Sequence, residues 1–274
     1  MNAPHRLDVA LVRRNLARSR EQAVRMIVSG RIIVDGHTAH KPAQPVRCGS
    51  HVEVVPNGED PEYVSRGGEK LAGALAVFGR RGLRAKGRRC LDLGASTGGF
   101  TDALLHEGAS EVVCVDVGRR QLVAPLRDDP RTTVLESTDA REVTQEQIGG
   151  RADLVVADLS FISLTLVLPV LDHLTTPSAD AVVLVKPQFE VGRGRLGKHG
   201  VVREPRLRLE AVRRVVAAAH DLGWGLQDVV PSPLPGPAGN VEYFLWLRAG
   251  PAHADEKAID HAVRTGPGGE KVSE

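Results

Sequence analysis

The fold of most of the chain is decided by RCLDLGASTGGF, residues 89–100. An apolar run ends there in a turn with glycines at positions 94, 98 and 99, after which helical spacing begins. Such a turn lets the backbone approach a ligand closely, and the N-terminus of the following helix offers it free N–H groups. The spacing is not G-x-G-x-x-G, so the turn by itself does not identify the ligand. It predicts a strand–turn–helix unit that binds a ligand at the turn.

On both sides of this turn, short apolar runs alternate along the chain with stretches of helical spacing. Further strands are expected at residues 111–118, 132–138, 152–160, 181–187 and 241–248, and helices at 67–78, 100–106, 163–173 and 205–222. Short continuous apolar runs are typical of parallel strands that are buried on both faces. Their alternation with helices predicts a doubly wound, mostly parallel α/β sheet.

An acidic residue ends the second of these strands. Asp116 stands where a carboxylate can accept hydrogen bonds from ribose hydroxyls. Together with the glycine turn, this pattern resembles the Rossmann-like, S-adenosylmethionine-dependent methyltransferases, and the resemblance implies S-adenosylmethionine as the cofactor. It places Asp139 beside the adenine and Asp158 beside the transferable methyl group. The cofactor-binding residues it implies are Asp92, Gly94, Ala95, Ser96, Thr97, Gly98, Gly99, Asp116, Val117, Asp139, Ala140 and Asp158. An NAD(P)-dependent enzyme stays open as an alternative, because fold does not fix function.

A lysine directly follows the apolar strand in LVKPQFEVG, residues 184–192. Lysine is costly to bury, so Lys186 either marks where the strand meets water or serves a ligand at the rim of the sheet. The order Lys70, Asp158, Lys186 and Glu242 is similar to the catalytic tetrad of the FtsJ-like RNA 2′-O-methyltransferases. We therefore expect Lys186 to bind or deprotonate a ribose 2′-hydroxyl, with Lys70 as a nearby cation. Asp158 and Glu242 would hold the two lysines in place.

The first sixty residues have a different pattern. Two helical segments precede a short strand, an Asp35-Gly36 turn and an alternating strand, which predicts a small α+β unit. The segments at residues 6–42 and 49–55 resemble the S4 RNA-binding domain. We expect RNA contacts here, from Arg66, and from a mobile, glycine-rich basic loop at residues 189–205. The expected RNA-binding residues are Arg6, Arg18, Arg20, Arg25, Lys41, Arg66, Arg193, Arg195 and Lys198. The alternative is that these cations only solvate a helix face and an ordinary loop.

Composition and charge narrow the class of protein, its cellular compartment and the kind of partner that we expect. The 274 residues are 42% hydrophobic and 26% charged with a net charge of +2, an ordinary globular balance. A second basic cluster lies at residues 80–89, either as a local RNA footprint or as solvated surface. The three scattered cysteines predict neither disulfides nor a metal site, and Cys90 and Cys114 lie in strand-like runs as small core residues. No signal peptide or membrane-length apolar run is found, so we expect a cytoplasmic protein without membrane contact. With aromatic residues at only 3%, a folded RNA is a better expected partner than a stacked single strand.

Over nearly its whole length the chain resembles the TlyA family. The motifs that carry this likeness are SRGGEKL, DLGASTGGFT, ADLSFISL, LVKPQFEVG and PGPAGNVEYFLWL. We expect an S4-like domain at residues 1–60, a linker at 61–66, an FtsJ-like methyltransferase domain at 67–250 and a polar tail at 251–274 that holds one short helix at 255–263. The resemblance implies 2′-O-methylation of cytidine in ribosomal RNA of both subunits, and a link to capreomycin susceptibility. The family is often labelled haemolysin, so a membrane-lytic protein and a non-catalytic RNA-binding protein stand as alternatives. The oligomeric state does not follow from the residues.

Overall fold

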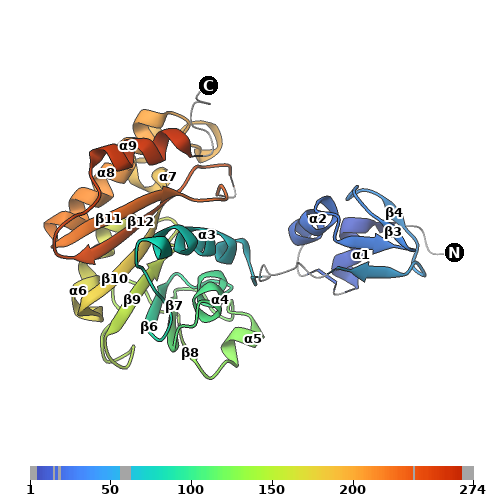
Figure 1. The fold of residues 1–274 in the computed structure, drawn as a ribbon, viewed down its shortest axis with the longest axis horizontal. Coiled ribbons are helices and arrows are strands. Elements are labelled where there is room, and N and C mark those ends of the chain that lie inside the picture. The colour runs from blue at the N-terminus through green and yellow to red at the C-terminus, as the bar shows by residue number, and fades with distance from the viewer. Residues whose placement is uncertain (1–4, 15, 18–19, 56–62, 237, 267–274) are drawn as a thin grey trace. The chain divides into compact units, whose positions relative to one another are not determined.

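The computed structural model describes residues 5–14, 16–17, 20–55, 63–236 and 238–266. The chain divides into two compact units, Met1–Glu62 and Tyr63–Glu274 (Figure 1). Arg18, residues 61–62 of the expected linker and residues 267–274 of the expected tail lie outside the described residues, as does the side chain of Arg193. Each unit is built around its own core and is described by itself.

The N-terminal unit joins two helices to a small sheet. Its elements are β1 (His5–Arg6), α1 (Leu7–Arg13), α2 (Arg20–Val28), β2 (Ile32–Val34), β3 (His37–Thr38), β4 (Pro45–Val46) and β5 (Val52–Val54). Within residues 20–55, β2 pairs antiparallel with both β3 and β5. Asp35 and Gly36 have φ values of 50° and 82°, and positive φ at both central residues defines the hairpin turn that Asp-Gly favours. Leu7, Leu11 and Ile27 form the fully buried centre of this unit.

The second unit is a sheet covered by helices on both faces. Within residues 63–236 and 238–266 the sheet has seven strands in the order β11-β12-β10-β9-β6-β7-β8. The strands are β6 (Arg89–Leu93), β7 (Glu111–Asp116), β8 (Thr132–Glu136), β9 (Ala152–Ala157), β10 (Thr175–Val185), β11 (Trp224–Pro231) and β12 (Tyr243–Ala249). β12 runs antiparallel to its neighbours β10 and β11, and the other pairs are parallel. The doubly wound, mostly parallel sheet predicted from sequence is confirmed.

Successive side chains of each central strand enter two different cores. Leu91 of β6 packs with residues of α6 (Leu171–Leu174), α8 (Pro205–Asp221) and α9 (Glu256–Thr265). Its neighbour Cys90 packs on the opposite face with residues of α3 (Arg66–Arg80), α4 (Gly99–His106) and α5 (Ala124–Arg127). Both faces are therefore buried, which explains why the strands read as continuous apolar runs.

One expected helix differs from the structure. Residues 163–173 form two short 3₁₀ helices, Leu164–Leu166 and Leu168–Val170, followed by α6, instead of one helix. Pro169 has no backbone N–H and cannot continue a regular α-helix through this stretch.

The short helix expected at residues 255–263 of the polar tail is present as α9. It packs on α8 and β11 through buried Ile259, Ala262 and Val263, so this part of the tail belongs to the core of the second unit. These three residues recur at helical spacing, so they form one apolar face.

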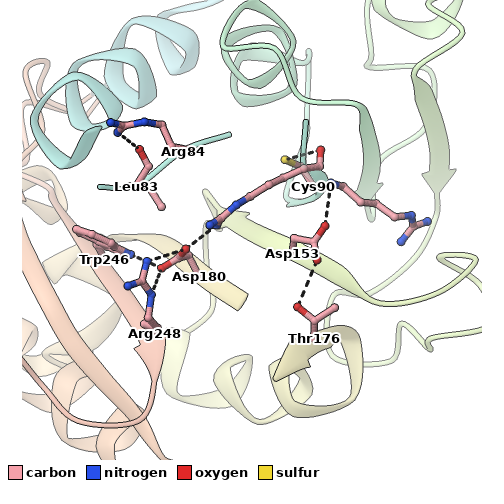
Figure 2. Close-up of polar contacts among 10 residues, drawn as sticks. Leu83, Arg84, Cys90, Asp153, Thr176, Asp180, Trp246 and Arg248 are labelled. Carbon is pink, nitrogen blue, oxygen red and sulfur yellow. Dashed lines mark hydrogen bonds and ion pairs between the residues drawn. The ribbon is translucent and has the colours of Figure 1, made fainter. Parts of the chain in front are cut away.

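A fully buried carboxylate ties three strands together at the end of the sheet where β6 begins. Asp180 of β10 lies opposite Arg248 of β12 and accepts hydrogen bonds from Trp246 Nε1 at 2.6 Å and Arg248 Nε at 2.8 Å (Figure 2). Arg88, just before β6, adds an ion pair to the second carboxylate oxygen at 2.5 Å. The guanidinium of Arg248 also lies 5.2 Å from the centre of the Trp246 ring.

Most basic side chains of the cluster at residues 80–89 form ion pairs or hydrogen bonds with other groups of the same unit. Besides Arg88, Arg89 pairs with Glu111 at 2.8 Å and Arg81 pairs with the buried carboxylate of Asp228 at 2.9 Å. Arg84 donates to the carbonyl of Leu83 at 2.7 Å, a contact also drawn in Figure 2. These contacts favour a structural role for the cluster over the RNA footprint considered from sequence.

Candidate active site

The glycine turn after β6 is a close fit against the neighbouring strand. Gly94 has a φ of 90°, and a side chain carbon added there would lie 2.6 Å from the carbonyl oxygen of Asp158, just after β9. Gly98 precedes α4 in the left-handed conformation, with a φ of 100°. Only glycine combines this backbone conformation with such an approach. The turn therefore holds the N-terminus of α4 beside the carboxyl ends of β6 and β9.

Two adjoining cavities open at this turn and share Gly94, Ser96 and Asp158. The larger has a volume of about 360 Å³, within the range of small-ligand sites. Its lining is Gly94, Ser96, Val115, Asp116, Val117, Gln121, Thr138, Ala140, Asp158, Leu159, Ser160 and Phe161. The smaller, of about 120 Å³, is bounded by the glycine turn and by Ser65 and Gly67 at the start of α3. Apolar side chains such as Val117 and Leu159, the carboxylates of Asp116 and Asp158, and a glycine cradle fit S-adenosylmethionine.

Asp116 lines the larger cavity in an orientation fixed by hydrogen bonds. One carboxylate oxygen accepts from the backbone N–H of Ser96 at 2.8 Å and the other from Gly118 at 2.6 Å. These two bonds fix the orientation of the carboxylate and join the turn after β6 to the end of β7. The predicted cofactor residues that line the two cavities are Gly94, Ala95, Ser96, Thr97, Gly99, Asp116, Val117, Ala140 and Asp158.

Two carboxylates among the predicted cofactor-binding residues, those of Asp92 and Asp139, line neither cavity. Asp92 is fully buried and accepts from Thr101 Oγ1 at 2.7 Å, and its burial raises the pKa of the carboxyl to about 7. The carboxylate of Asp139 pairs with Arg141 at 2.6 Å, and this hydrogen-bonded partner lowers the pKa of Asp139. Thr138 and Ala140, on either side of Asp139, line the larger cavity. Gly98 shapes the turn without lining either cavity.

Sheet register brings the other expected catalytic residues to one edge. Asp158 directly follows β9 and Lys186 directly follows β10, which runs parallel to β9. Glu242 directly precedes β12, and because β12 is antiparallel, its first residue Tyr243 lies opposite Val185 at the end of β10. Asp158, Lys186 and Glu242 therefore leave adjacent strands at the same edge, next to the glycine turn.

At that edge each lysine has its own carboxylate. Lys186 Nζ lies 2.6 Å from Asp158 Oδ1 and donates to Ser160 Oγ at 2.8 Å. Lys70 Nζ, from the first turns of α3, lies 2.6 Å from Glu242 Oε2, and these two side chains are only 8% and 1% exposed. Each lysine thus contacts one of the two carboxylates expected to hold it, and the expected action of Lys70 as a cation on Lys186 stays a prediction. Asp158 is the immediate charged partner of Lys186, whereas Lys70 is neutralised by Glu242.

Sequence reasoning missed four residues that join the segments carrying Asp158 and Lys186. Ser160 accepts from Lys186, and the rings of Phe161 and Phe189 lie 5.3 Å apart. Glu190 is buried and accepts from Ser163 Oγ at 2.5 Å and from the N–H of Leu164 at 2.8 Å. Phe161 is 92% exposed with a φ of 66°, a rare combination for an aromatic residue. Their only signal in the sequence was proximity to Asp158 or Lys186.

The expected RNA-binding residues fall into different environments. Arg6 and Arg20 share the buried carboxylate of Asp8, and Lys41 is exposed on the same unit. In the second unit, Arg66 donates to the carbonyl of Pro235 at 2.7 Å, and Arg195 is paired with Glu210 through both of its Nη groups. Arg25 is half-buried and Lys198 is exposed.

The basic loop after α7 (Pro187–Glu190) is anchored at its end, and its expected mobility stays a prediction. Buried Asn240 accepts from the N–H of Val202 at 2.9 Å and donates to the carbonyl of Gly200 at 3.1 Å. Val202 itself packs with Val191 and Ala211 in a small apolar cluster. The loop is therefore tied to the segment that leads into Glu242 and β12.

Across the described residues, no group of three or more histidine, cysteine, aspartate or glutamate side chains is placed to hold a metal ion. No helix in the same part of the chain is both long and apolar enough to cross a membrane. Cys90 and Cys114 are buried, as expected, and burial raises the pKa of each thiol to about 12.

Comparisons with known proteins agree with this geometry. Residues 63–249 match the FtsJ-like methyltransferase family and residues 5–52 match the S4 domain. A Mycobacterium tuberculosis protein named 16S/23S rRNA (cytidine-2′-O)-methyltransferase TlyA is 54% identical over 96% of this chain and 98% of its own length. Hemolysin A of Brachyspira hyodysenteriae is 36% identical over 87% of this chain and 98% of its own. A solved Streptococcus thermophilus structure that carries a hemolysin name has a TM-score of 0.73 and 37% identity, covering 95% of this chain and 94% of that one. The chain therefore belongs to the TlyA family, in which an S4 domain is joined to an FtsJ-like methyltransferase.

Proposed function

We propose that the protein transfers the methyl group of S-adenosylmethionine to the 2′-hydroxyl of cytidine in ribosomal RNA of both subunits. The observation that carries this proposal is the Lys186–Asp158 ion pair at the rim of the cofactor cavities, because Asp158 lines both cavities while it contacts the lysine. The name of the Mycobacterium tuberculosis relative supports the same substrate. Some relatives carry a hemolysin name, but the FtsJ-like match over residues 63–249 and the cavities favour methyl transfer.

Different residues are assigned to cofactor binding and to the reacting hydroxyl group. When bound, S-adenosylmethionine supplies a methyl group already activated by the sulfonium centre, so alignment and proton handling remain for the protein. We assign Asp116 to the cofactor ribose and the turn at Gly94 to the methionine portion. Lys186 Nζ, held between Asp158 and Ser160, would orient the 2′-oxygen of the RNA. The hydroxyl proton would pass to the Lys186–Asp158 pair as the 2′-oxygen forms its bond to the methyl carbon. The bond from that carbon to the sulfonium sulfur would break in the same step, leaving S-adenosylhomocysteine.

The second pair has a supporting role in this proposal. Lys70 and Glu242 are almost completely buried, and each neutralises a charge that would be costly alone. Their contact fixes α3 against the start of β12, immediately beside the end of β10 that carries Lys186. Loss of either partner should therefore affect stability as well as activity, whereas loss of Lys186 should affect activity alone.

The test is methyl transfer from labelled S-adenosylmethionine to unmodified small and large ribosomal subunits. Wild type is compared with Lys186→Ala and with Lys257→Ala, a control at an exposed lysine of α9. We expect label at cytidines that resist alkaline cleavage, lost in Lys186→Ala and retained in Lys257→Ala, with cofactor affinity unchanged in both. Full activity of Lys186→Ala would disprove the catalytic assignment. Absence of label from both subunits with wild type would overturn the function itself.

A further inference from the structure

A buried carboxylate lies beneath two of the arginines expected to bind RNA. Asp8 of α1 accepts from Arg6 Nε and Nη2, both at 3.0 Å, and from Arg20 Nε at 2.9 Å. The Asp8 side chain is 1% exposed, whereas those of Arg6 and Arg20 are 48% and 61% exposed. The carboxylate is thus covered by protein while both guanidinium groups reach the surface. Asp8 had no role in the sequence-based prediction.

The same contacts set the charge and the place of this cluster. Hydrogen bonds from Arg6 and Arg20 lower the pKa of Asp8 to about 2, so the carboxylate stays ionised at any physiological pH. The backbone N–H of Asp8 donates to the carbonyl of Pro42 at 3.1 Å, which brings the cluster next to exposed Lys41. Arg6 and Arg20 therefore meet at one carboxylate, and Lys41 directly precedes the residue whose carbonyl binds the Asp8 backbone.

We propose that Asp8 is a positioning residue for RNA binding, which orients Arg6 and Arg20 toward backbone phosphates. This inference rests on the proposed function and deepens it. Asp8 engages the inner edge of Arg6 and only the Nε of Arg20, so the Nη1 group of Arg6 and both Nη groups of Arg20 are not used in these bonds. Guanidinium groups bind phosphate through such forked donors. Holding two long side chains in place beforehand also lowers the entropy lost on binding.

The opposing view assigns Asp8 only an electrostatic effect on RNA. A negative charge beside a phosphate-binding surface repels RNA, so its removal should strengthen binding, especially at low salt. Positioning predicts the reverse, because the freed arginines would lose their orientation. The sign of the change in affinity therefore separates the two views.

The experiment measures the affinity of the full-length protein for unmodified ribosomal subunits over a range of salt concentrations. Asp8→Asn should weaken binding by about tenfold, which corresponds to about 1.4 kcal/mol, and should reduce the salt dependence. Glu53→Gln removes a carboxylate charge from an exposed position on β5 and is the matched charge control, expected to leave affinity nearly unchanged. Unchanged or tighter binding of Asp8→Asn would overturn the proposal.

A folding control separates orientation from loss of structure. Leu11→Ala removes a fully buried side chain from the same core without touching the arginine cluster. We expect it to lower the unfolding temperature of the N-terminal unit yet to bind RNA like wild type where that unit is folded. Leu11→Ala could weaken RNA binding as much as Asp8→Asn at an equal loss of stability. In that case the loss of affinity in Asp8→Asn comes from unfolding, and the proposal is wrong.

The arginines themselves distinguish this inference from the proposed function. Arg6→Ala and Arg20→Ala should each weaken subunit binding. If neither does while labelled methyl groups still reach the RNA, the positioning role of Asp8 is wrong but the methyltransferase assignment stands. If Arg20→Ala weakens binding and Asp8→Asn does not, RNA contact by the S4 domain stands and only the role of Asp8 fails.

Discussion

Asp92 and Asp180 are fully buried carboxylates of one sheet, but their surroundings are opposite in character. Asp180 is compensated by the guanidinium groups of Arg88 and Arg248 and by the indole N–H of Trp246. Among the described residues, Asp92 has the Thr101 hydroxyl as its hydrogen-bonding side-chain partner and no ion-pair partner, and burial raises its pKa to about 7. Burial alone therefore does not predict charge state, and the partners of each residue decide it.

Asp180→Asn should destabilise the second unit by about 3 kcal/mol, because Arg88 and Arg248 would be left near each other without a counter-charge. The urea midpoint of unfolding measures this loss. Glu256→Gln, at the exposed pair with Arg213, is the control and should cost less than about 1 kcal/mol. Cofactor affinity should be unchanged in folded Asp180→Asn, because Asp180 lies at the edge of the sheet away from the glycine turn. Equal losses for the two variants would contradict the structural importance assigned to Asp180.

Asp92 makes stability depend on pH in a defined direction. The unfolded chain releases this proton near pH 3.8, whereas the folded chain keeps it until about pH 7. As pH rises through that window the unfolded state is favoured, so the contribution of Asp92 to stability falls. Asp92→Asn cannot ionise, and we expect its free energy of unfolding to improve relative to wild type as pH increases from about 4 to about 7. Urea unfolding at both ends of the window tests this, and a constant difference would show that Asp92 does not titrate there.

At the scale of elements, three contacts join α7 to the segment after β9. Lys186 contacts Asp158, Phe189 contacts Phe161, and Glu190 binds Ser163 and Leu164. Lys186 directly precedes this short helix, and the buried glutamate is its last residue. Glu190 lines neither cavity, so we expect any effect of Glu190 on catalysis to act through the position of Lys186.

We therefore expect Glu190→Ala to lower the rate of methyl transfer, by up to about a hundredfold, since a small misplacement of a reacting group has effects of that size. Cofactor affinity should change little, because Glu190 lines neither cavity. Glu190→Gln keeps an acceptor for Ser163 and should restore most of the rate. Single-turnover methylation and calorimetric cofactor binding provide the two readouts. A rate in Glu190→Gln as low as in Glu190→Ala would argue for a role of the charge itself.

Elements with local signals were predictable, whereas those that depend on distant partners were not. β6, β7, β9 and the second half of β10, from Ala181, are mostly continuous apolar runs and match expected strands. β11 was missed because Gln227 and Asp228 interrupt its pattern, and only the folded chain supplies their partners at Pro251 and Arg81. The order of the four catalytic candidates came from family resemblance, but their pairing depends on strand register. Asp8 and Glu190 were overlooked because an acidic residue acquires a role only from the groups that surround it.

At the scale of the whole molecule, the two units have separate apolar cores. Leu11 is fully buried in the first, and Leu91 is fully buried in the second. Cavities, glycine turn and lysine–carboxylate pairs all belong to the second unit, whereas the cluster around Asp8 belongs to the first. Cofactor binding and the S4-domain part of RNA binding should therefore respond to different substitutions.

Heating should reveal two unfolding transitions. Leu11→Ala should lower only one of them, by a loss of about 2–5 kcal/mol in the free energy of unfolding of the first unit. Saturating S-adenosylmethionine should raise only the other, because a ligand stabilises the unit that binds it. Scanning calorimetry with and without cofactor tests both statements. A single transition that shifts as one in both experiments would show that the units unfold together.

The contact between Lys70 and Glu242 joins residues 172 positions apart in the chain. Ribosomes synthesise the chain from its N-terminus, so Lys70 emerges long before its partner exists. The arginines of the S4 domain emerge earlier still. The edge that carries Lys186 and Glu242 is therefore complete only after β12 has been synthesised, whereas the N-terminal unit is available before it.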